Sequence, residues 1–341
     1  MDRGVVVEEL GRLELVEIEV EEPAAREVLV RIEATGVCHS DLHVLETGFS
    51  HPLPILLGHE GAGVVESVGP GVETVSVGDR VVVGWRAPCG ECRWCARGDT
   101  RRCRTPAAAG PRVRLRDGRA LTRTLGAGTF ATRTVVHERA AVRIEGVPLV
   151  QACLLGCAVA TGVGSVLETA RVWPGARVGV IGCGAVGLSV IQGARIAGAS
   201  EVHALDLDER KLDAAKRFGA THTGEASRLD FVFDVVGRPE TVEQGLAMLG
   251  HAGTLVYIGL PQPGARVDFP LQQAFDRRVR FLVSHGGDHV PRLDFPALAA
   301  HAREGRLDLA GMVTKTIGLD EVEQAFDDMR AGDVIRSVIL L

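Results

Sequence analysis

The sequence predicts an α/β protein of two domains, in which a β-rich N-terminal domain precedes a doubly wound parallel sheet. Three observations predict this fold class. The chain has 341 residues, enough for about two domains that each bury a hydrophobic core. Short apolar stretches separated by Gly, Pro and Asp dominate the first 150 residues, which is typical of short strands. From Arg177 onward, apolar strands alternate with helical segments, which is typical of βαβ units.

The expected elements follow from where the apolar stretches meet turn residues. In the first domain, strands are expected at residues 28–32, 63–68, 80–83 and 134–137. In the second domain, strands are expected at 178–181, 202–207, 231–236, 254–258 and 279–283, and helices at 186–197 and 209–218. The last fifty residues are expected to hold helices at 295–304 and 319–331 and a strand at 337–341. The predicted boundaries are therefore 1–157, 158–285 and a C-terminal segment, 286–341, that returns to the first domain.

Composition excludes several classes of protein. Hydrophobic residues make up 46% and charged residues 24% of the chain, as in ordinary globular proteins. The net charge is −6 and no aromatic platform accompanies the basic residues, which argues against a nucleic-acid partner. No apolar run is long enough to cross a bilayer and no signal peptide is evident, so we expect no membrane partner and a cytoplasmic location with reduced thiols.

Four cysteines, Cys89, Cys92, Cys95 and Cys103, follow the spacing C-x2-C-x2-C-x7-C. Thiols this close in sequence can converge on one tetrahedral ion, and zinc is the usual occupant of four thiolates. A disulfide knot requires a short secreted chain, and an iron–sulfur cluster is the remaining alternative. Four thiolates leave no open position for a substrate, so we expect a structural zinc in a lobe at about 86–104. The surrounding arginines could offset the thiolate charge, could form a solvated basic loop, or could do both: Arg86, Arg93, Arg97, Arg101, Arg102 and Arg104.

A glycine motif, G-x-G-x-x-G, lies between an expected strand and an expected helix. Gly182 permits the tight turn, Gly184 lets the backbone approach a pyrophosphate, and Gly187 allows close helix–strand packing. Asp206 lies 19 residues past Gly187 at the end of the next strand, where it would accept hydrogen bonds from ribose hydroxyls. Its charge, with that of Asp208, disfavours a 2′-phosphate, so NAD is favoured over NADP. The predicted cofactor residues here are Gly182, Gly184, Ala185, Val186, Gly187, Asp206 and Lys211.

Three further segments offer metal ligands: 38–41, 58–60 and 155–157. Spacing alone does not link them, because a lone Cys or His is more often a packed or surface residue than a ligand. Several stretches nevertheless match a known family in order along the chain. They are GVCHSDLH (36–43), LLGHEGAGVVESVG (56–69), the four-cysteine lobe, LLGCAVATGVGS (154–165), VIGCGAVGLSV (180–190) and GDVIRSV (332–338). Over essentially its full length the chain resembles the zinc-dependent medium-chain alcohol dehydrogenases.

The resemblance implies a GroES-like catalytic domain followed by a Rossmann domain that binds NAD. It implies that Cys38, His59 and Cys157 hold a catalytic zinc whose fourth position is open, so that each chain carries two zinc ions. It also implies that Asp41 orients His59 and that Glu60 lies behind the metal. A finer likeness, to the mycothiol-dependent formaldehyde dehydrogenases, is carried by residues 123–138, 218–223, 234–241 and the C-terminal end.

The implied reaction is hydride transfer between NAD and a primary alcohol or a thiol hemiacetal. The metal would lower the pKa of the bound alcohol, and Ser40 would pass its proton through the cofactor ribose to His43. His39 and Arg336 are expected at the pyrophosphate, and Trp85 is expected in the wall of the substrate pocket. The backbone of Ile258, Gly259 and Leu260 is expected near the nicotinamide.

The chain departs from the family in one place, between Thr223 and Asp230, where a segment that usually holds a helix is short. The loop from Arg104 to Thr129 is long and resembles the dimeric branch, so we expect a homodimer. Two alternatives stay open at this point. One is an aldehyde or imine reductase that uses the same site in the opposite direction, and the other is a non-catalytic nucleotide-binding or redox-sensing protein.

Overall fold

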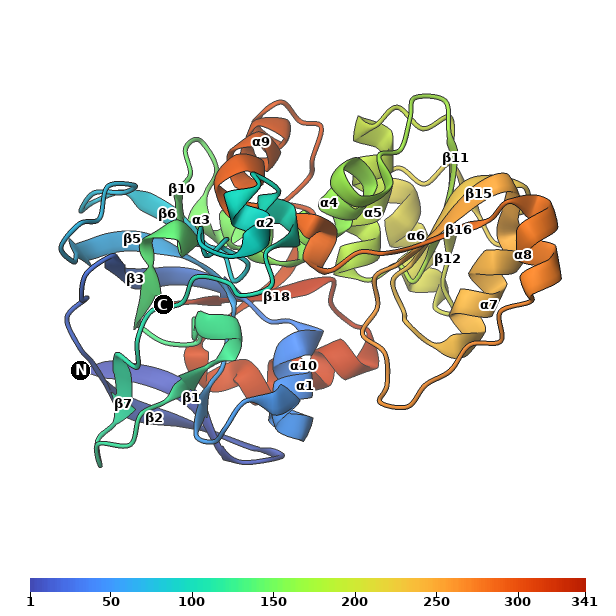
Figure 1. Cartoon of the computed structure of the whole chain (residues 1–341). Coiled ribbons are helices and arrows are strands. Elements are labelled where there is room, and N and C mark those ends of the chain that lie inside the picture. The colour runs from blue at the N-terminus through green and yellow to red at the C-terminus, as the bar shows by residue number, and fades with distance from the viewer. The chain divides into compact units, whose positions relative to one another are not determined.

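A computed structural model describes all 341 residues of the chain, which divide into two compact units. Unit 1 contains Met1–Cys157, Val290–Gly305 and Leu309–Leu341, and unit 2 contains Ala158–His289 and Arg306–Asp308. The chain therefore leaves unit 1 after Cys157 and re-enters it at Val290, whereas we placed the second boundary at residue 286. Figure 1 shows the elements of each unit along the chain.

Unit 1 is rich in β-structure. Its strands are β1 Asp2–Glu9, β2 Arg12–Val20, β3 Glu27–Gly36, β4 Ile55–Leu56, β5 Glu60–Val68, β6 Arg80–Val83, β7 Val113–Leu115, β8 Thr122–Arg123, β9 Arg133–His137, β10 Ala141–Arg143, β17 Val313–Ile317 and β18 Arg336–Leu340. Its α-helices are α1 His39–Thr47, α2 Arg93–Ala96, α3 Leu149–Ala152, α9 Pro291–Arg303 and α10 Val322–Ala331. The long segment that we expected as a loop after Cys103 contains the short strands β7 and β8.

Two sheets organise unit 1. One has the strand order β7-β2-β1-β4-β8, and the other has the order β10-β6-β5-β3-β18-β17 with β9 also paired to β3. Strand β3 is central, since it pairs with β5, β9 and β18, and its side chains are buried on both faces for most of its length. The C-terminal strand β18 is thus an interior strand of the sheet, antiparallel to β3 and parallel to β17.

Helix α10 shows why the C-terminal segment belongs to unit 1. Val322, Ala325, Phe326 and Met329 are buried at the i, i+3, i+4 and i+7 positions of one helix face. They join a core cluster that also contains residues of β1, α1 and β18. Burying this face removes four apolar side chains from water, so the segment is held by the hydrophobic effect as well as by β18.

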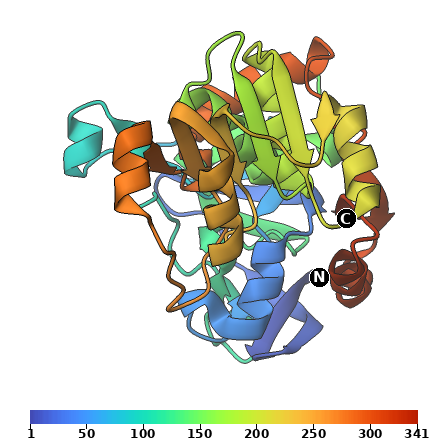
Figure 2. The same cartoon turned by 90° about the vertical axis from the view of Figure 1, so that its right-hand side faces the viewer.

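Unit 2 is an α/β unit built on one parallel sheet. Its strands are β11 Arg177–Ile181, β12 Glu201–Leu205, β13 His222–Thr223, β14 Leu229–Asp234, β15 Leu249–Tyr257 and β16 Arg280–Val283, in the order β13-β12-β11-β14-β15-β16. Its helices are α4 Ala158–Gly164, which continues as a π-helical turn at Ser165–Ala170, then α5 Ala185–Ile196, α6 Glu209–Phe218, α7 Pro239–Met248 and α8 Leu271–Arg277. Every pairing in this sheet is parallel, and Figure 2 shows its green and yellow strands standing side by side.

The strand order reverses direction between β11 and β14, where a crevice for a ligand forms at the carboxyl ends of the strands in this fold class. The prediction of a parallel sheet is confirmed, and so is the short connection after Thr223. Residues 224–228 hold no helix, and β14 begins at Leu229. Helices α4, α7 and α8 of this unit were absent from the sequence prediction.

No single helix is both long and apolar enough to cross a membrane, although the adjoining helical segments Leu149–Gly156 and Ala158–Ala170 pass that test when they are taken together.

Candidate active site and metal sites

The four cysteines of the lobe converge as the spacing predicts. Four of the distances between their Sγ atoms lie between 3.6 and 4.0 Å. A tetrahedral zinc with Zn–S bonds of about 2.3 Å requires sulfurs about 3.8 Å apart, whereas a disulfide requires about 2.05 Å. All four thiols are free, so the geometry fits an ion and excludes the disulfide knot.

Backbone N–H groups surround these sulfurs. Cys89 donates to the Sγ of Cys103, and both Glu91 and Cys92 donate to the Sγ of Cys89, at 3.3 to 3.4 Å. The N–H of Cys95 is the largest cause that lowers the pKa of the Cys92 thiol, to about 6. Backbone N–H groups therefore favour the thiolate form of Cys89 and Cys92.

The arginines of the lobe have other partners. The guanidinium groups of Arg93 and Arg102 lie 4.5 and 5.2 Å from the centre of the Trp94 ring, where they make cation–π contacts. Arg101 forms two hydrogen bonds with Asp294 of α9, at 2.7 and 3.1 Å. The lobe is thereby joined to the helix with which the chain re-enters unit 1.

A second group of ligands gathers inside unit 1. Cys38 is the N-cap of α1, His59 and Glu60 stand at the start of β5, and Cys157 follows the 3₁₀ turn Cys153–Gly156. One ligand atom of each residue lies within 4.8 Å of the others, and all four residues are buried. The structure thus brings together three segments that spacing alone could not link.

Asp41 fixes the orientation of His59. Its Oδ1 accepts hydrogen bonds from the His59 ring at Nδ1 (2.9 Å) and from the Gly58 N–H (3.1 Å), while its Oδ2 accepts from the Cys38 N–H (3.1 Å). With Nδ1 engaged, Nε2 of His59 is buried and has no hydrogen-bond partner. A buried nitrogen without a partner, facing two thiols, is the arrangement that a metal ion would complete.

The groups around Cys38 also favour a metal ion at this site. The hydrogen bond from Cys157 is the largest cause that holds the pKa of the Cys38 thiol well below its usual value, and the Arg336 guanidinium adds to it. The thiolate is the metal-binding form of cysteine. Two cysteines and one histidine therefore suit zinc, with Glu60 within reach as a further oxygen donor.

Glu60 is fully buried and paired with Arg336. Nη2 of Arg336 lies 2.9 Å from Oε1 of Glu60, Nη1 donates to the Val37 carbonyl, and Nη2 also lies 3.7 Å from the Cys38 Sγ. Oε2 of Glu60 has no partner, and burial is the main cause that raises the pKa of this carboxyl to about 7. Gly36 makes room for Glu60, because a Cβ there would stand 2.1 Å from Oε2.

Arg336 differs from an ordinary C-terminal surface arginine, since it is only 3% exposed. Both of its terminal nitrogens are engaged within unit 1, and its Nε alone has no partner. Its contact with the cofactor pyrophosphate stays a prediction. His39, the other residue expected at the pyrophosphate, is exposed at the first position of α1.

The remaining residues predicted for catalysis lie on or near α1. Ser40 places its Oγ 3.8 Å from the Cys38 Sγ, beside the candidate metal group. His43 is half-buried three residues further along α1, and its ring packs edge-on against Phe49. Trp85, predicted in the pocket wall, is half-buried after β6.

The glycine motif forms the predicted turn in unit 2. Gly182 has a φ of +94° after β11, and Gly184 is the N-cap of α5. A Cβ at Gly187 would stand 1.9 Å from the carbonyl oxygen of Gly182, so only glycine allows the helix this close to the turn. A Cβ at Gly184 would meet nothing within 4 Å, which leaves its backbone open to an approaching ligand. Ala185 and Val186 begin α5, where N–H groups are free to bind phosphate.

Asp206 supports the same turn. Its Oδ2 accepts a hydrogen bond from the Cys183 N–H (2.8 Å), and its Oδ1 accepts from the Asp208 N–H (3.0 Å). Each oxygen retains a lone pair for a ribose hydroxyl. Lys211 is half-buried in the first turns of α6.

One residue of this region was missed by sequence reasoning. Asp234 ends β14, and its Oδ1 caps the N–H groups of Val236 and Gly237, while its carbonyl accepts from the N–H groups of Ile258 and Gly259. It therefore joins the loop after β14 to the 258–260 segment expected at the nicotinamide. The available signal was an acidic residue at a strand end, three residues before a glycine.

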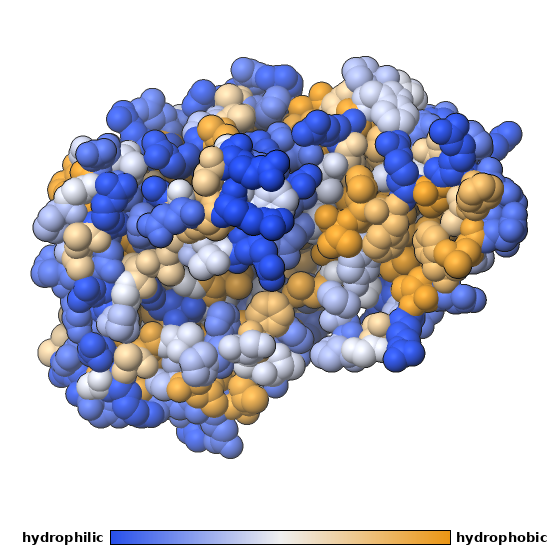
Figure 3. Space-filling view, viewed as in Figure 1, coloured by the Kyte–Doolittle hydropathy of each residue, from blue (hydrophilic) through white to orange (hydrophobic).

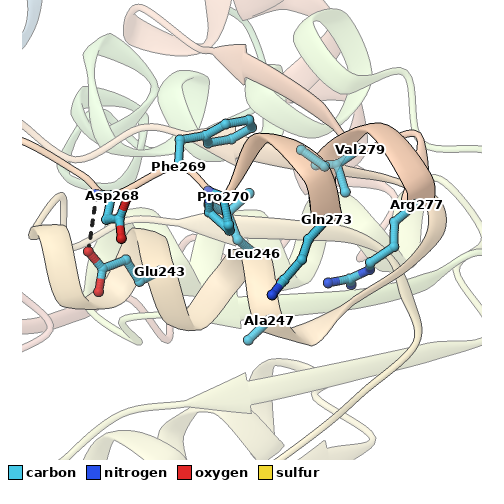
Figure 4. A pocket seen from close by; sticks show the side chains of 10 residues that line it. Glu243, Leu246, Ala247, Asp268, Phe269, Pro270, Gln273, Arg277 and Val279 are labelled. Atoms are coloured by element: carbon cyan, nitrogen blue, oxygen red, sulfur yellow. Dashed lines mark hydrogen bonds between the residues drawn. The ribbon is translucent and has the colours of Figure 1, made fainter.

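A pocket of about 240 Å³ lies between α7 and α8, away from all the predicted site residues. Its lining includes Glu243, Leu246, Phe269, Pro270 and Arg277, as Figure 4 shows. None of these residues forms a metal-binding group.

A buried pair of thiols with an oriented imidazole can hold a metal ion, and the glycine turn of unit 2 can bind a dinucleotide. A chain that carries both has the parts of a metal-dependent dehydrogenase. Comparison with known proteins supports this assignment to the dehydrogenases. Residues 24–146 match the alcohol dehydrogenase GroES-like domain, and residues 185–304 match the zinc-binding dehydrogenase family. The chain belongs to the zinc-dependent medium-chain alcohol dehydrogenase family.

Individual relatives cover nearly the whole chain. An S-(hydroxymethyl)glutathione dehydrogenase from Paracoccus denitrificans is 34% identical, over 99% of this chain and 99% of its own length. Among solved structures, an alcohol dehydrogenase zinc-binding domain protein from Burkholderia ambifaria has a TM-score of 0.95 at 31% identity, covering 100% of this chain and 98% of the other. A benzyl alcohol dehydrogenase from Acinetobacter calcoaceticus has a TM-score of 0.92 at 30% identity, covering 100% and 99%. The protein is thus an oxidoreductase that interconverts alcohols and aldehydes with a nicotinamide cofactor.

Proposed function

We propose that this dehydrogenase uses NAD and two zinc ions per chain to oxidise primary alcohols or thiol hemiacetals. The observation that carries the proposal is the buried group of Cys38, His59 and Cys157, in which the His59 Nε2 has no partner in the protein. Zinc held there by these three residues would polarise the substrate oxygen and lower its pKa. The four cysteines of the lobe would hold the second, structural zinc.

The protein's own residues supply the path for the proton. Ser40 lies beside the metal group and takes the proton of the substrate hydroxyl. His43 follows at i+3 on the same face of α1, so it can receive that proton, with the cofactor ribose hydroxyl between, and release it to solvent. Asp41 keeps His59 in one tautomer throughout, because its Oδ1 holds the ring at Nδ1.

NAD is the proposed cofactor because of Asp206. Its carboxylate stands at the end of β12 and is tied to the glycine turn through the Cys183 N–H. The charge would repel the 2′-phosphate of NADP, while its free lone pairs accept from the two hydroxyls of the NAD ribose. His39 and Arg336 are the proposed pyrophosphate contacts in unit 1.

The substrate class is drawn from the relatives. The relative from Paracoccus denitrificans acts on a thiol adduct of formaldehyde, as its name states, and the one from Acinetobacter calcoaceticus acts on benzyl alcohol. The chain also carries the finer likeness to mycothiol-dependent formaldehyde dehydrogenases. We therefore place thiol hemiacetals first and plain primary alcohols second.

The decisive experiment measures NADH formation from formaldehyde alone, with mycothiol and with glutathione, beside benzyl alcohol and simple primary alcohols. Turnover only with a thiol assigns the hemiacetal, and turnover only with the plain alcohols refutes it. The Cys157→Ala variant should lose turnover in every assay. Cys153→Ala is the matched control, since Cys153 is also a buried free thiol but lies outside the group of metal ligands. Equal turnover of Cys157→Ala and wild type would overturn the assignment of the catalytic metal.

A homodimer is proposed from the edge of the parallel sheet. Strand β16 pairs only with β15, and its Phe281 and Val283 are 42% and 61% exposed. Leu271 and Phe275 of the adjacent α8 are 75% and 81% exposed, and Figure 3 shows this apolar surface in orange where Figure 1 labels α8 and β16. A second copy that pairs its own β16 about a twofold axis would satisfy the open edge and cover these side chains.

Sedimentation measurements test the dimer. Phe281→Arg should yield monomers, whereas Leu293→Arg, at a more exposed leucine of α9 in unit 1, should sediment as wild type does. A wild-type monomer at micromolar concentration would refute the proposal.

Because thiolate zinc sites require reduced cysteines, we also propose a cytoplasmic location.

A further inference from the structure

Unit 2 holds a third group of metal-binding side chains, outside the two zinc sites. Glu201 and His203 lie on β12 and His222 lies on β13, and one ligand atom of each is within 4.8 Å of the others. The Nε2 of His203 is 2.9 Å from Oε2 of Glu201. The two imidazole rings stack with their centres 4.5 Å apart.

Strand register explains why these three side chains meet. Glu201 and His203 are two residues apart on β12, so they project from the same face of the sheet. His203 is the direct neighbour of His222 across the parallel pairing of β12 with β13. The intervening Val202 and the following Ala204 are buried. The backbone register therefore places the three side chains beside one another.

The partners of His222 leave one of its nitrogens available to a ligand. Its Nδ1 lies 2.8 Å from the Thr221 hydroxyl, which in turn donates to the Val202 carbonyl. When the hydroxyl proton is directed at that carbonyl, Nδ1 donates the ring proton to the hydroxyl oxygen and Nε2 keeps its lone pair for a ligand. Histidine ligands of metals are usually held in this way, through their second nitrogen.

Glu201 supplies an anionic oxygen. Hydrogen bonds from His203 and from Arg177 hold the pKa of its carboxyl below the usual value. The bonds from the Nε2 of His203 and the Nε of Arg177 both reach Oε2, so Oε1 remains for a ligand. The cluster is reachable from solvent, since His222 is exposed and the Glu201 side chain is 36% exposed.

We propose that Glu201, His203 and His222 form a third metal site, for a divalent ion of the class that prefers imidazole nitrogen and carboxylate oxygen, such as Zn²⁺, Ni²⁺ or Co²⁺. Coordination by Nε2 of His203 requires its ring proton, which now points at Glu201, to move to Nδ1 by exchange with solvent, and water completes the coordination. The ion joins the two-residue edge strand β13 to β12. This site is independent of the proposed substrate and of both zinc sites. If the proposal of a third metal site is wrong, the assignment as a dehydrogenase is unaffected.

The test is a calorimetric titration of Ni²⁺ into the enzyme with both zinc sites filled. Wild type should bind one Ni²⁺ per chain with a dissociation constant in the micromolar range, and its thermal midpoint should rise when Ni²⁺ is present. His222→Ala and Glu201→Gln should each weaken binding at least tenfold. His251→Ala is the matched control, because His251 is an exposed histidine on β15 of the same sheet, and it should bind as wild type does.

Two results would overturn the proposal. One is the absence of a Ni²⁺ ion beyond the two zinc ions in wild type. The other is equal binding by wild type and His222→Ala, which would place the ion elsewhere. Unchanged NADH binding by both histidine variants shows that unit 2 is folded, so that a loss of Ni²⁺ binding is read as loss of a ligand.

Discussion

Replacing Asp41 by Asn should weaken the catalytic zinc and leave the structural zinc in place. Asp41 is fully buried and accepts three hydrogen bonds, two at Oδ1 from Gly58 and His59 and one at Oδ2 from Cys38. Asparagine has a single oxygen, so in either orientation its NH₂ group meets a donor. If the oxygen stays with His59, the N–H of Cys38 is left unsatisfied. If the amide is turned, His59 loses its acceptor.

The size of the effect follows from those contacts. Leaving one buried donor without a partner costs about 1–3 kcal/mol, and the loss falls on a zinc ligand in both orientations. Since about 1.4 kcal/mol corresponds to a factor of ten, zinc affinity should fall about 10–100-fold. The assay is competition with a graded series of chelators, followed by zinc counting.

The four-cysteine site serves as an internal reference in that assay, and its zinc should be retained at the same chelator strength in variant and wild type. Asp79→Asn is the matched control, because it removes a carboxylate that accepts from a backbone N–H (Ser76, 2.8 Å) far from any ligand. Equal loss of both zinc ions in Asp41→Asn would indicate general destabilisation and refute the reasoning. Unchanged affinity of the catalytic site would refute it as well.

Three further predictions concern other parts of the chain. Asp206→Ala should lower the KM for NADP at least tenfold and raise that for NAD, and steady-state kinetics with NADP no better than in wild type would contradict the assigned ribose contact. Cys103→Ser should release one of two zinc ions and lower the thermal midpoint while NADH binding persists, as mass spectrometry and melting curves would show; a variant that keeps two zinc ions would be evidence against the four-cysteine site. The hydrogen bond from Arg133 is the largest cause that holds the pKa of Asp2 below its ordinary value. The ionised carboxylate therefore stabilises the fold above its unfolded pKa of about 3.9, and this stabilisation is lost as the pH falls through the lower pKa of the folded state. Asp2→Asn should therefore unfold at lower denaturant than wild type at pH 7 and at a similar concentration near pH 2, and a difference that grew on acidification would contradict the sign.

The sequence predicted best those features whose partners are close along the chain. The four cysteines lie within fifteen residues and the three glycines within six, so spacing alone carries the geometry. The Cys38, His59 and Cys157 group was different, because β3, β5 and the turn before Cys157 must first assemble. For that group, only the resemblance to a family identified the three residues as metal ligands.

The features that the sequence did not predict depend on contacts between residues far apart along the chain. Arg336 and Glu60 are 276 positions apart, and the burial of Arg336 follows from the insertion of β18 beside β3. An arginine near the end of a chain carries no local sign of that. Helices α7 and α8 were missed because their apolar faces are narrow, and α8 has no buried residue at all.

The interior position of β18 has a consequence for synthesis of the protein. Unit 2 is continuous apart from Arg306–Asp308, so nearly all of it can leave the ribosome and begin to fold while unit 1 still lacks a strand. The edge of β3 at Ala34–Gly36, which will pair with β18, stays open until residues 336–340 emerge. Glu60 and Cys38 meet Arg336 only then, so the nascent chain carries an unfinished metal centre and an exposed strand edge for almost its entire translation.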